Sequence, residues 1–298
     1  EMGYEHRFDQ YDVNIEKPRP LVPRFLRLPV VERCNARGDV LLKLDENSVR
    51  DLISTLRENQ IESVAIVLLH AYANPDHERR IRDILSAELP DLWISLSSEV
   101  CPEIREYERM STASANAYVQ PLMASYLTDL DSKLRTEGAV CPLFLMTSGG
   151  GLTTVQTARA HPIRLMESGP AGGAILAGHI ALECGLDKVL SYDMGGTTAK
   201  ICLIDEGKPQ TSRTFEVDRQ YRFTKGSGLP LRIPVIEMVE IGAGGGSIAK
   251  IDNLNRIQVG PESAGSEPGP ACYDQGGEDA TVTDADVALG RIAPEGFA

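Results

Sequence analysis

The sequence lacks a long hydrophobic run, and its longest uninterrupted apolar stretch covers only residues 64–69. A membrane-spanning helix needs about 20 consecutive apolar residues, so no part of the chain is expected to cross a membrane. A secretory leader is not expected either. Basic residues are scarce, because 30 lysines and arginines stand against 43 aspartates and glutamates and give a net charge of −13. This balance disfavours nucleic acid and anionic membranes as main partners, since both need a basic surface.

The six cysteines include no C-x-x-C pair. Scattered cysteines in a chain of 298 residues are typical of reduced thiols, so neither a disulfide framework nor a zinc site is expected. Histidines point the same way, because four of them fall in separate predicted elements: His70, His77, His161 and His179. Even His70 and His77 span a strand end and a helix start, which is a poor geometry for joint ligation. We therefore expect a cytoplasmic globular protein without a histidine metal site.

Alternating strand and helix patterns predict an α/β protein. Residues 45–60 place apolar side chains at the spacing of one buried helix face, and residues 63–69 form an apolar run of strand length. A helix that starts at Asn74 and Pro75 comes next, followed by a strand at residues 92–96. This order indicates a right-handed crossover between parallel strands. The chain length predicts about two domains.

The middle of the chain is predicted to be mainly helical. Residues 104–135 have the pattern of one long helix, which Pro121 should kink or split. Strands are expected at residues 143–146 and 163–166, before a helix of small residues at 171–184. The small side chains of this last helix would allow another helix or domain to approach closely.

Residues 188–205, KVLSYDMGGTTAKICLID, carry the most informative pattern. They predict two strands joined by a glycine–threonine turn, with Asp193 at the end of the first strand, where it could hold a hydrated Mg²⁺. Adjacent glycines let a backbone approach a ligand and turn its N–H groups outward, and threonine hydroxyls add donors. The alternative is an ordinary hairpin turn, but the flanking strands favour a phosphate cradle. The residues predicted to bind phosphate are Gly195, Gly196, Thr197 and Thr198.

A second glycine-rich loop follows the strand predicted at residues 235–241. Its position after a strand favours a loop whose backbone approaches a nucleotide or a substrate. The alternative is a flexible turn before the next predicted strand, at residues 247–251. Residues 148–151 leave the same two interpretations open. The residues of the second loop that we predict to bind the cofactor are Gly244, Gly245 and Gly246.

The D-x-G-G-T-T hairpin resembles the phosphate loop of the superfamily that contains actin, sugar kinases and heat-shock chaperone ATPases. Five segments, in order, resemble signatures of the hydantoinase A/5-oxoprolinase family: LMTSGGGLT, LMESGPAGG, SYDMGGTTAK, VEIGAGGGSIA and GSEPGPACYDQGG. Each segment is a weak signal alone, but their order over essentially the whole chain is specific. The resemblance implies an actin-like (ribonuclease H-like) ATPase fold of α/β class, with mixed sheets flanked by helices, and ATP and Mg²⁺ as cofactors.

The resemblance also implies a division into lobes. Residues 1–165 would be the remainder of a first ATPase lobe, and residues 166–298 would be the hinge helix and the start of a second lobe. Family members carry another phosphate loop and extend further, so we expect an internal fragment that does not complete the nucleotide site alone. Asp193 and Glu167 would be catalytic, Glu167 by holding a metal-bound water or orienting a nucleophile. The alternative for Glu167 is a carboxylate that stabilises a helix start.

The implied activity is ATP-dependent opening of a cyclic amide, such as a hydantoin, 5-oxoproline or a lactam, through phosphorylation of the amide carbonyl. A small cyclic amide would then be the substrate, and a second, B-type subunit is the expected partner. Two alternatives share the same motifs. One is an ATP-using subunit of a ketone carboxylase, and the other is a non-catalytic nucleotide-binding module.

Overall fold

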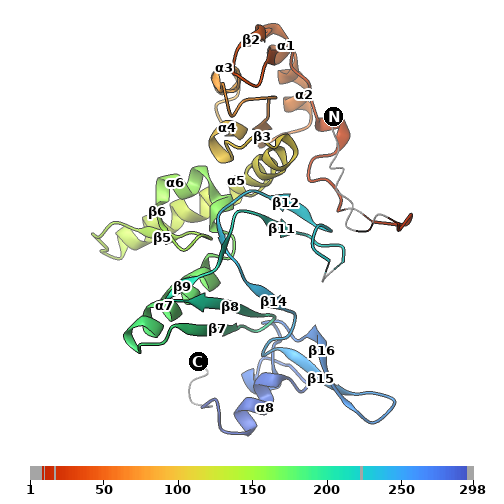
Figure 1. Cartoon of the computed structure of the whole chain (residues 1–298), viewed down its shortest axis with the longest axis vertical. Coiled ribbons are helices and arrows are strands. Elements are labelled where there is room, and N and C mark those ends of the chain that lie inside the picture. Colours follow the sequence, from red (N-terminus) through yellow and green to blue (C-terminus); the bar gives the residue numbers. More distant parts are fainter. Residues whose placement is uncertain (1–8, 10, 17, 222–223, 294–298) are drawn as a thin grey trace. The chain divides into compact units, whose positions relative to one another are not determined.

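The computed structural model describes residues 9, 11–16, 18–221 and 224–293. The chain forms two compact units (Figure 1), of which the first comprises Glu1–Ser168 and Ser212–Val235, and the second Gly169–Thr211 and Ile236–Ala298. Short strands lie where the chain passes between the units: β10 (Thr211–Ser212) and β13 (Val235–Ile236). The lobes expected at residues 1–165 and 166–298 concern a whole ATPase and stay a prediction.

The first unit begins with a 3-10 turn, η1 (Arg24–Leu26), and an antiparallel pair of strands, β1 (Arg33–Cys34) and β2 (Val40–Leu42). The helix expected at residues 45–60 is present as two segments, α1 (Glu46–Arg50) and α2 (Leu52–Glu58). Asp45 caps α1 by accepting a hydrogen bond from the Asn47 N–H. Asp51, which lies between the two segments, has α-helical φ and ψ angles. The helical backbone therefore continues from α1 into α2.

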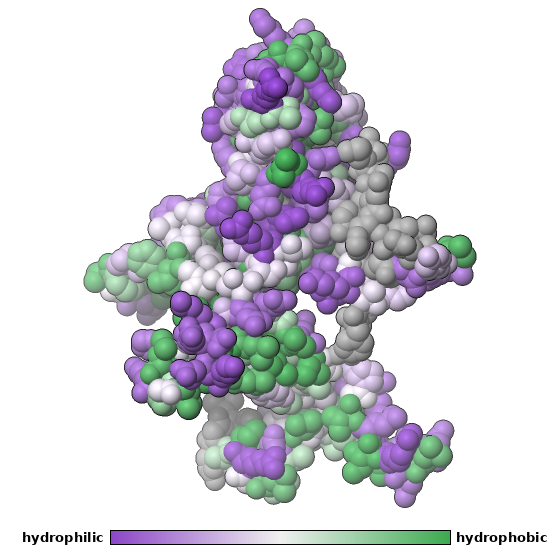
Figure 2. Space-filling view, viewed as in Figure 1, coloured by the Kyte–Doolittle hydropathy of each residue, from purple (hydrophilic) through white to green (hydrophobic). Residues whose placement is uncertain are grey.

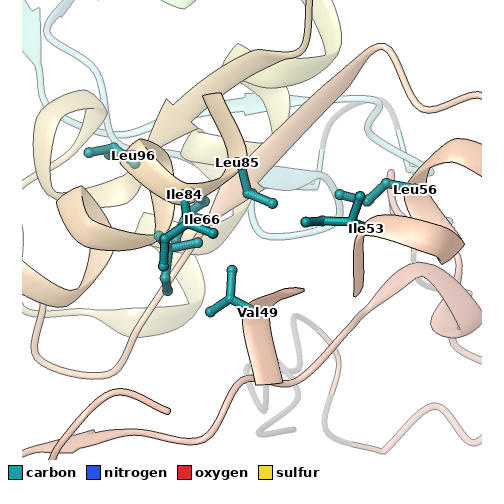
Figure 3. Close-up of a cluster of buried hydrophobic side chains, with 8 residues drawn as sticks. Val49, Ile53, Leu56, Ile66, Ile84, Leu85 and Leu96 are labelled. Atoms are coloured by element: carbon teal, nitrogen blue, oxygen red, sulfur yellow. The ribbon is translucent and has the colours of Figure 1, made fainter. Parts of the chain in front are cut away.

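The predicted crossover is confirmed. Strand β3 (Ser63–Ile66) pairs in parallel with β4 (Trp93–Leu96), and α3 (Asp76–Glu88) connects them. Apolar side chains from the strands and from the three helices form one buried core (Figure 3), because each helix presents its apolar stripe to the sheet. The buried members of this core are Val49, Ile53, Leu56, Ile66, Ile81, Ile84, Leu85 and Leu96.

A short helix, α4 (Ser97–Val100), leads into the long helix α5 (Glu106–Thr136). Pro121 was expected to kink or split this helix. It lies inside α5 and does not split it. The proline ring is compatible with helical φ, and its cost is one missing backbone hydrogen bond together with crowding against the preceding turn. The packing of α5 against its neighbours outweighs that cost, since nine of its side chains are buried.

Beyond α5, the strands β5 (Phe144–Met146) and β6 (Leu152–Thr154) form a hairpin, and α6 (Val155–Ala160) follows. The strand predicted at residues 163–166 is wrong, because this stretch is a 3-10 turn, η2 (Pro162–Leu165). Pro162 starts the turn, and the Ile163 N–H donates to the Asn116 side chain rather than to a neighbouring strand. The unit is completed by the antiparallel pair β11 (Phe215–Val217) and β12 (Leu229–Leu231).

The second unit is built on the helix α7 (Ser168–Glu183) and a four-stranded sheet. The sheet has the order β14-β8-β7, with β9 on β8, and its strands are β7 (Lys188–Met194), β8 (Ala199–Asp205), β9 (Lys208–Pro209) and β14 (Val239–Ile241). Small side chains of α7 pack on β8, and a Cβ at Gly178 would lie 2.6 Å from the Gly207 carbonyl oxygen. The small-residue helix therefore permits close approach to its own sheet.

The rest of the second unit is a hairpin followed by short helical segments. The strand predicted at residues 247–251 is confirmed as β15 (Ser247–Ile251), which pairs with β16 (Ile257–Ser263). The last elements are η3 (Ala271–Tyr273) and α8 (Val282–Ala288). The expected α/β fold is confirmed, with one parallel pair of strands, β3–β4, beside antiparallel sheets. No helix among the described residues combines the length and the apolar character that a bilayer crossing requires.

Candidate functional site

The glycine–threonine turn lies where the sequence predicts it, between the antiparallel strands β7 and β8. Asp193 is opposite Lys200 and Met194 is opposite Ala199 in the strand register. The Gly195 N–H donates to the Thr198 carbonyl oxygen at 3.0 Å and closes the turn. The predicted phosphate residues therefore form the tip of one hairpin, and Asp193 stands two residues before its first glycine.

The second glycine loop packs directly on this tip. The Gly245 N–H donates to the Gly195 carbonyl oxygen at 2.9 Å, and the Gly246 N–H donates to the Gly196 carbonyl oxygen at 2.7 Å. A Cβ at Gly244 would lie 2.5 Å from the Gly196 oxygen, so only glycine permits this approach. Backbone hydrogen bonds thus join two loops that are about 50 residues apart in the sequence.

This contact fixes the direction of two N–H donors. In a planar trans peptide the C=O and the following N–H point to opposite sides. Since the glycine loop holds the carbonyls of Gly195 and Gly196, the N–H groups of Gly196 and Thr197 point away from that loop. Successive N–H groups turned to one side form an anion-binding concavity. The tip is therefore suited to an anion such as phosphate.

The N–H groups of the glycine loop itself are engaged within the chain. The Gly244 N–H donates to the Ser247 hydroxyl at 2.9 Å, and those of Gly245 and Gly246 hold the hairpin. On its other side the loop accepts a hydrogen bond from the Thr283 N–H to the Gly245 carbonyl oxygen, at 2.8 Å. Cofactor binding by Gly244, Gly245 and Gly246 stays a prediction, and the geometry favours a supporting role for this loop.

Two charged residues that the sequence analysis did not place in the site lie beside the turn. Lys200 donates through Nζ to Thr198 Oγ1 at 3.0 Å and to Glu240 Oε1 at 3.1 Å, and its side chain is only 16% exposed. Directly paired strand residues share a sheet face, so Asp193, Lys200 and Glu240 form one row across β7, β8 and β14. The strand register places Lys200 next to the turn.

Asp284 anchors α8, the element behind the glycine loop. Its carboxylate accepts from the Thr281 N–H and hydroxyl and from the Cys272 N–H at 2.7–2.8 Å, which completes a capping box. Burial alone would raise the pKa of Asp284, but the hydrogen bonds from Thr281 and Cys272 outweigh it and lower the pKa to about 2. Asp284 thus stays ionised at neutral pH and fixes the turn that carries Thr283.

Glu167 precedes α7 and belongs to the first unit. Its φ of 54° lies in the left-handed region, which is uncommon for a residue with a side chain. Such backbone strain often accompanies functional sites. Its catalytic role stays a prediction.

The donor set fits the two groups that the sequence analysis expects. The N–H groups of Gly196 and Thr197 and the ammonium of Lys200 suit a phosphate group. Asp193 supplies one exposed carboxylate, and Mg²⁺ in nucleotide sites commonly takes only one or two protein carboxylates beside water and phosphate oxygens.

A glycine hairpin at the edge of a helix-backed sheet is an arrangement typical of phosphate-binding proteins. The chain belongs to the hydantoinase/oxoprolinase family, whose model matches residues 109–298, and the N-terminal region of the same family matches residues 1–89. The family resemblance found in the sequence is thereby confirmed.

Curated relatives include a lactamase and a ketone carboxylase. The caprolactamase subunit alpha of Pseudomonas jessenii is 38% identical over 98% of this chain and 41% of the relative. The acetophenone carboxylase gamma subunit of Aromatoleum aromaticum is 34% identical over 94% of this chain and 38% of the relative. A nucleotide-free structure of acetone carboxylase, described under ATP-dependent acetone carboxylation, matches with a TM-score of 0.75 and 29% identity over 93% of this chain and 38% of that one. The chain spans about two fifths of the length of these relatives.

Proposed function

We propose that the chain supplies one phosphate-binding half of an ATP site in an enzyme that opens a cyclic amide, such as a hydantoin, 5-oxoproline or a lactam. The observation that carries the proposal is the pair of glycine carbonyls held by the second glycine loop, because it turns two N–H groups outward. Support for the reaction class comes from the family and from the caprolactamase relative. The proposal includes Mg²⁺, which Asp193 would hold. It also includes a cytoplasmic location, which rests on the composition and the scattered cysteines.

Each residue of the site has a distinct task in this proposal. Gly196 and Thr197 bind phosphate oxygens through their N–H groups, and the Thr198 hydroxyl and Lys200 add a donor and a positive charge. Glu240 holds Lys200 in place through their ion pair. Asp193 holds the hydrated Mg²⁺. Prearranged donors of this kind stabilise the charge that develops during phosphoryl transfer without reorganising at the moment of reaction.

An amide carbonyl is a poor electrophile, and ATP would supply the phosphoryl group that makes its oxygen a leaving group. The chain's own contribution is to bind and orient phosphate, while the opposing half of the site and the substrate pocket would come from other parts of the enzyme. Relatives are named as alpha and gamma subunits, which supports a second subunit as partner. The proposed role of Glu167 is to hold a metal-bound water or to orient a nucleophile.

A second candidate is an ATP-using subunit of a ketone carboxylase. It is favoured by the acetophenone carboxylase relative and by the structural match to acetone carboxylase. The phosphate half of the site would do the same work in both reactions, so the residues described here do not separate them. A non-catalytic nucleotide-binding module is the third possibility, and it predicts nucleotide binding without turnover.

Phosphate release from ATP tests the proposal in the complete enzyme with its partner subunit. We expect release to depend on one substrate class when 5-oxoproline, hydantoins, lactams and aryl ketones with bicarbonate are offered in turn. Stimulation by ketones alone would select the carboxylase, and nucleotide binding without release under any substrate would select the non-catalytic module.

The variant Asp193→Ala tests the site itself. We expect substrate-dependent release to fall by more than about a hundredfold, as for loss of a metal-holding group, with an unchanged melting temperature. The matched control is Asp205→Ala, at the far end of β8 and also exposed, which should retain activity. Full turnover in Asp193→Ala would contradict the assignment of this carboxylate.

A further inference from the structure

A second cluster of chemically active side chains lies in the first unit, remote in sequence from the glycine hairpin. Glu32 immediately precedes β1, Cys34 is the last residue of that strand, and His77 comes from the first turn of α3. The His77 Nδ1 lies 2.8 Å from Glu32 Oε2 and 3.7 Å from Cys34 Sγ. One ligand atom from each residue falls within 4.8 Å of the other two. The sequence analysis did not expect such a site, because the cysteines are scattered without a C-x-x-C pair and the histidines fall in separate predicted elements.

The three side chains are withdrawn from solvent. Cys34 is 2% exposed, and the side chains of Glu32 and His77 are 6% and 13% exposed. Among the described residues, the ion pair of Glu32 is with His77. Burial raises the pKa of the Cys34 thiol, and the carboxylates of Glu32 and Asp76 raise it further. A carboxylate, a thiol and an imidazole that are buried together offer the oxygen, sulfur and nitrogen ligands that zinc takes in proteins.

The spacing is close to that of a metal centre. Zinc binds thiolate sulfur at about 2.3 Å and imidazole nitrogen at about 2.0–2.1 Å in tetrahedral geometry. Those bond lengths place a sulfur and a nitrogen ligand about 3.5 Å apart, and a nitrogen and an oxygen ligand about 3.3 Å apart. The observed 3.7 Å between sulfur and nitrogen already fits. The 2.8 Å between nitrogen and oxygen has to open by about half an ångström, a rotation of one glutamate side chain.

We propose that Glu32, Cys34 and His77 bind a zinc-type divalent cation through one carboxylate oxygen, one thiolate and the imidazole Nδ1, with water as the fourth ligand. The ligands carry two negative charges in total, which balance a divalent ion. On binding, the thiol releases its proton to solvent. The imidazole also gives up the Nδ1 proton that it donates to Glu32 in the metal-free state, and it then carries its proton on Nε2. The ion joins β1 to the start of α3, and so closes the N-terminal hairpin on the crossover helix.

Cobalt(II) is a direct probe for this site, because its absorption reports both geometry and thiolate ligation. The purified protein is first stripped with a chelator, then titrated with cobalt, and then with zinc as competitor. We expect one equivalent of cobalt to give the visible bands of a tetrahedral centre together with a near-ultraviolet sulfur-to-cobalt charge-transfer band. Zinc should abolish both and raise the melting temperature, since it binds the folded state selectively.

Single variants identify the ligands. Cys34→Ser should lose the charge-transfer band, and His77→Gln and Glu32→Gln should weaken cobalt binding by at least about tenfold. The matched control is Cys141→Ser, which removes an exposed free cysteine and should leave the spectrum unchanged. Circular dichroism and melting curves of each metal-free variant show whether it is folded. Cys34→Ser changes one atom only, and so it keeps the test decisive if a charge variant does not fold.

Two results would overturn the proposal. A charge-transfer band that persists in Cys34→Ser would mean that another thiol binds the metal. Absence of one-equivalent binding to the folded wild-type protein would mean that the cluster is a hydrogen-bonded trio without a metal. Neither result bears on the proposed ATP site, since no residue is shared between the two sites.

Discussion

The first unit buries whole ionic side chains, whereas the second unit relies on backbone brought against backbone. In the first, Arg109 and Glu78 are both fully buried and share the Ser97 hydroxyl. Arg109 also donates to the carbonyl oxygens of Leu68 and Glu103. In the second, several close contacts join two glycines, as between Gly178 and Gly207 or Gly244 and Gly196. The first arrangement depends on particular side chains, and the second depends on the absence of a side chain.

The sheet of the second unit has an exposed apolar face. One face of the β14-β8-β7 sheet carries exposed apolar side chains, and Figure 2 shows hydrophobic residues gathered over this region. These side chains are 41–63% exposed: Leu190, Tyr192, Met194, Leu203, Val239 and Ile241. The core of the first unit is closed by helices (Figure 3).

The largest effect is expected from Glu78→Ala in the first unit. Its carboxylate accepts from the Leu68 N–H, the Ser97 hydroxyl and the Ser98 N–H at 2.6–2.9 Å. Removing it leaves these three buried donors unpaired, which should lower the free energy of unfolding by about 3–5 kcal/mol. Urea unfolding measures this. The control is Glu88→Ala, an exposed position on the same helix, which should leave the free energy of unfolding nearly unchanged. Equal urea midpoints for the two variants would contradict a stabilising role for the Glu78 hydrogen bonds.

An intermediate effect is expected from Gly178→Ala in the second unit. The new Cβ would meet the Gly207 carbonyl oxygen at 2.6 Å, and overpacking of this kind costs about 1–3 kcal/mol. Gly173→Ala, an exposed position on the same helix, should instead stabilise by up to about 1 kcal/mol through helix propensity. Melting temperatures of the pair provide the test. A stabilised Gly178→Ala would show that the backbone contact can relax without cost.

A smaller, pH-dependent effect is expected at Asp284. Its pKa falls from 3.8 to about 2 in the folded protein, so its stabilising contribution is present above about pH 4 and is lost as the pH falls through 2. Asp284→Asn should therefore be less stable at neutral pH and show a weaker loss of stability on acidification between pH 4 and pH 2. Asp286→Asn on the same helix is the control. Parallel acid curves for wild type and Asp284→Asn would exclude this coupling.

Local patterns in the sequence predicted much of the fold. The crossover was predicted from three local features: the apolar run at β3, the proline at the start of α3 and the strand β4. The strand β15 was predicted with its observed bounds. The strand expected at residues 163–166 failed, because Asn116 supplies from far away the hydrogen bond that a neighbouring strand would give. Pro121 failed to split α5, because long-range packing outweighs a local preference.

The candidate site was predictable only in part, for a similar reason. The hairpin of Gly195 and Gly196 has a local signature, but the use of Gly245 as a donor to it depends on a contact across 50 residues. Lys200 belongs to the site because the strand register places it opposite Asp193, and Glu240 belongs to it because it forms an ion pair with Lys200. The Glu32, Cys34 and His77 cluster has no local signature at all, since its members meet only after β1 and α3 have packed.

The chain of hydrogen bonds from the hairpin to α8 makes the glycine loop a mechanical link. Thr283 holds Gly245 through its carbonyl oxygen, and Gly245 holds Gly195 through its N–H. A displacement of the hairpin tip must therefore carry the loop and the start of α8 with it, or break these bonds. The exchange of the amide protons of Gly245, Gly246 and Thr283 with solvent therefore reports how firmly the hairpin is held.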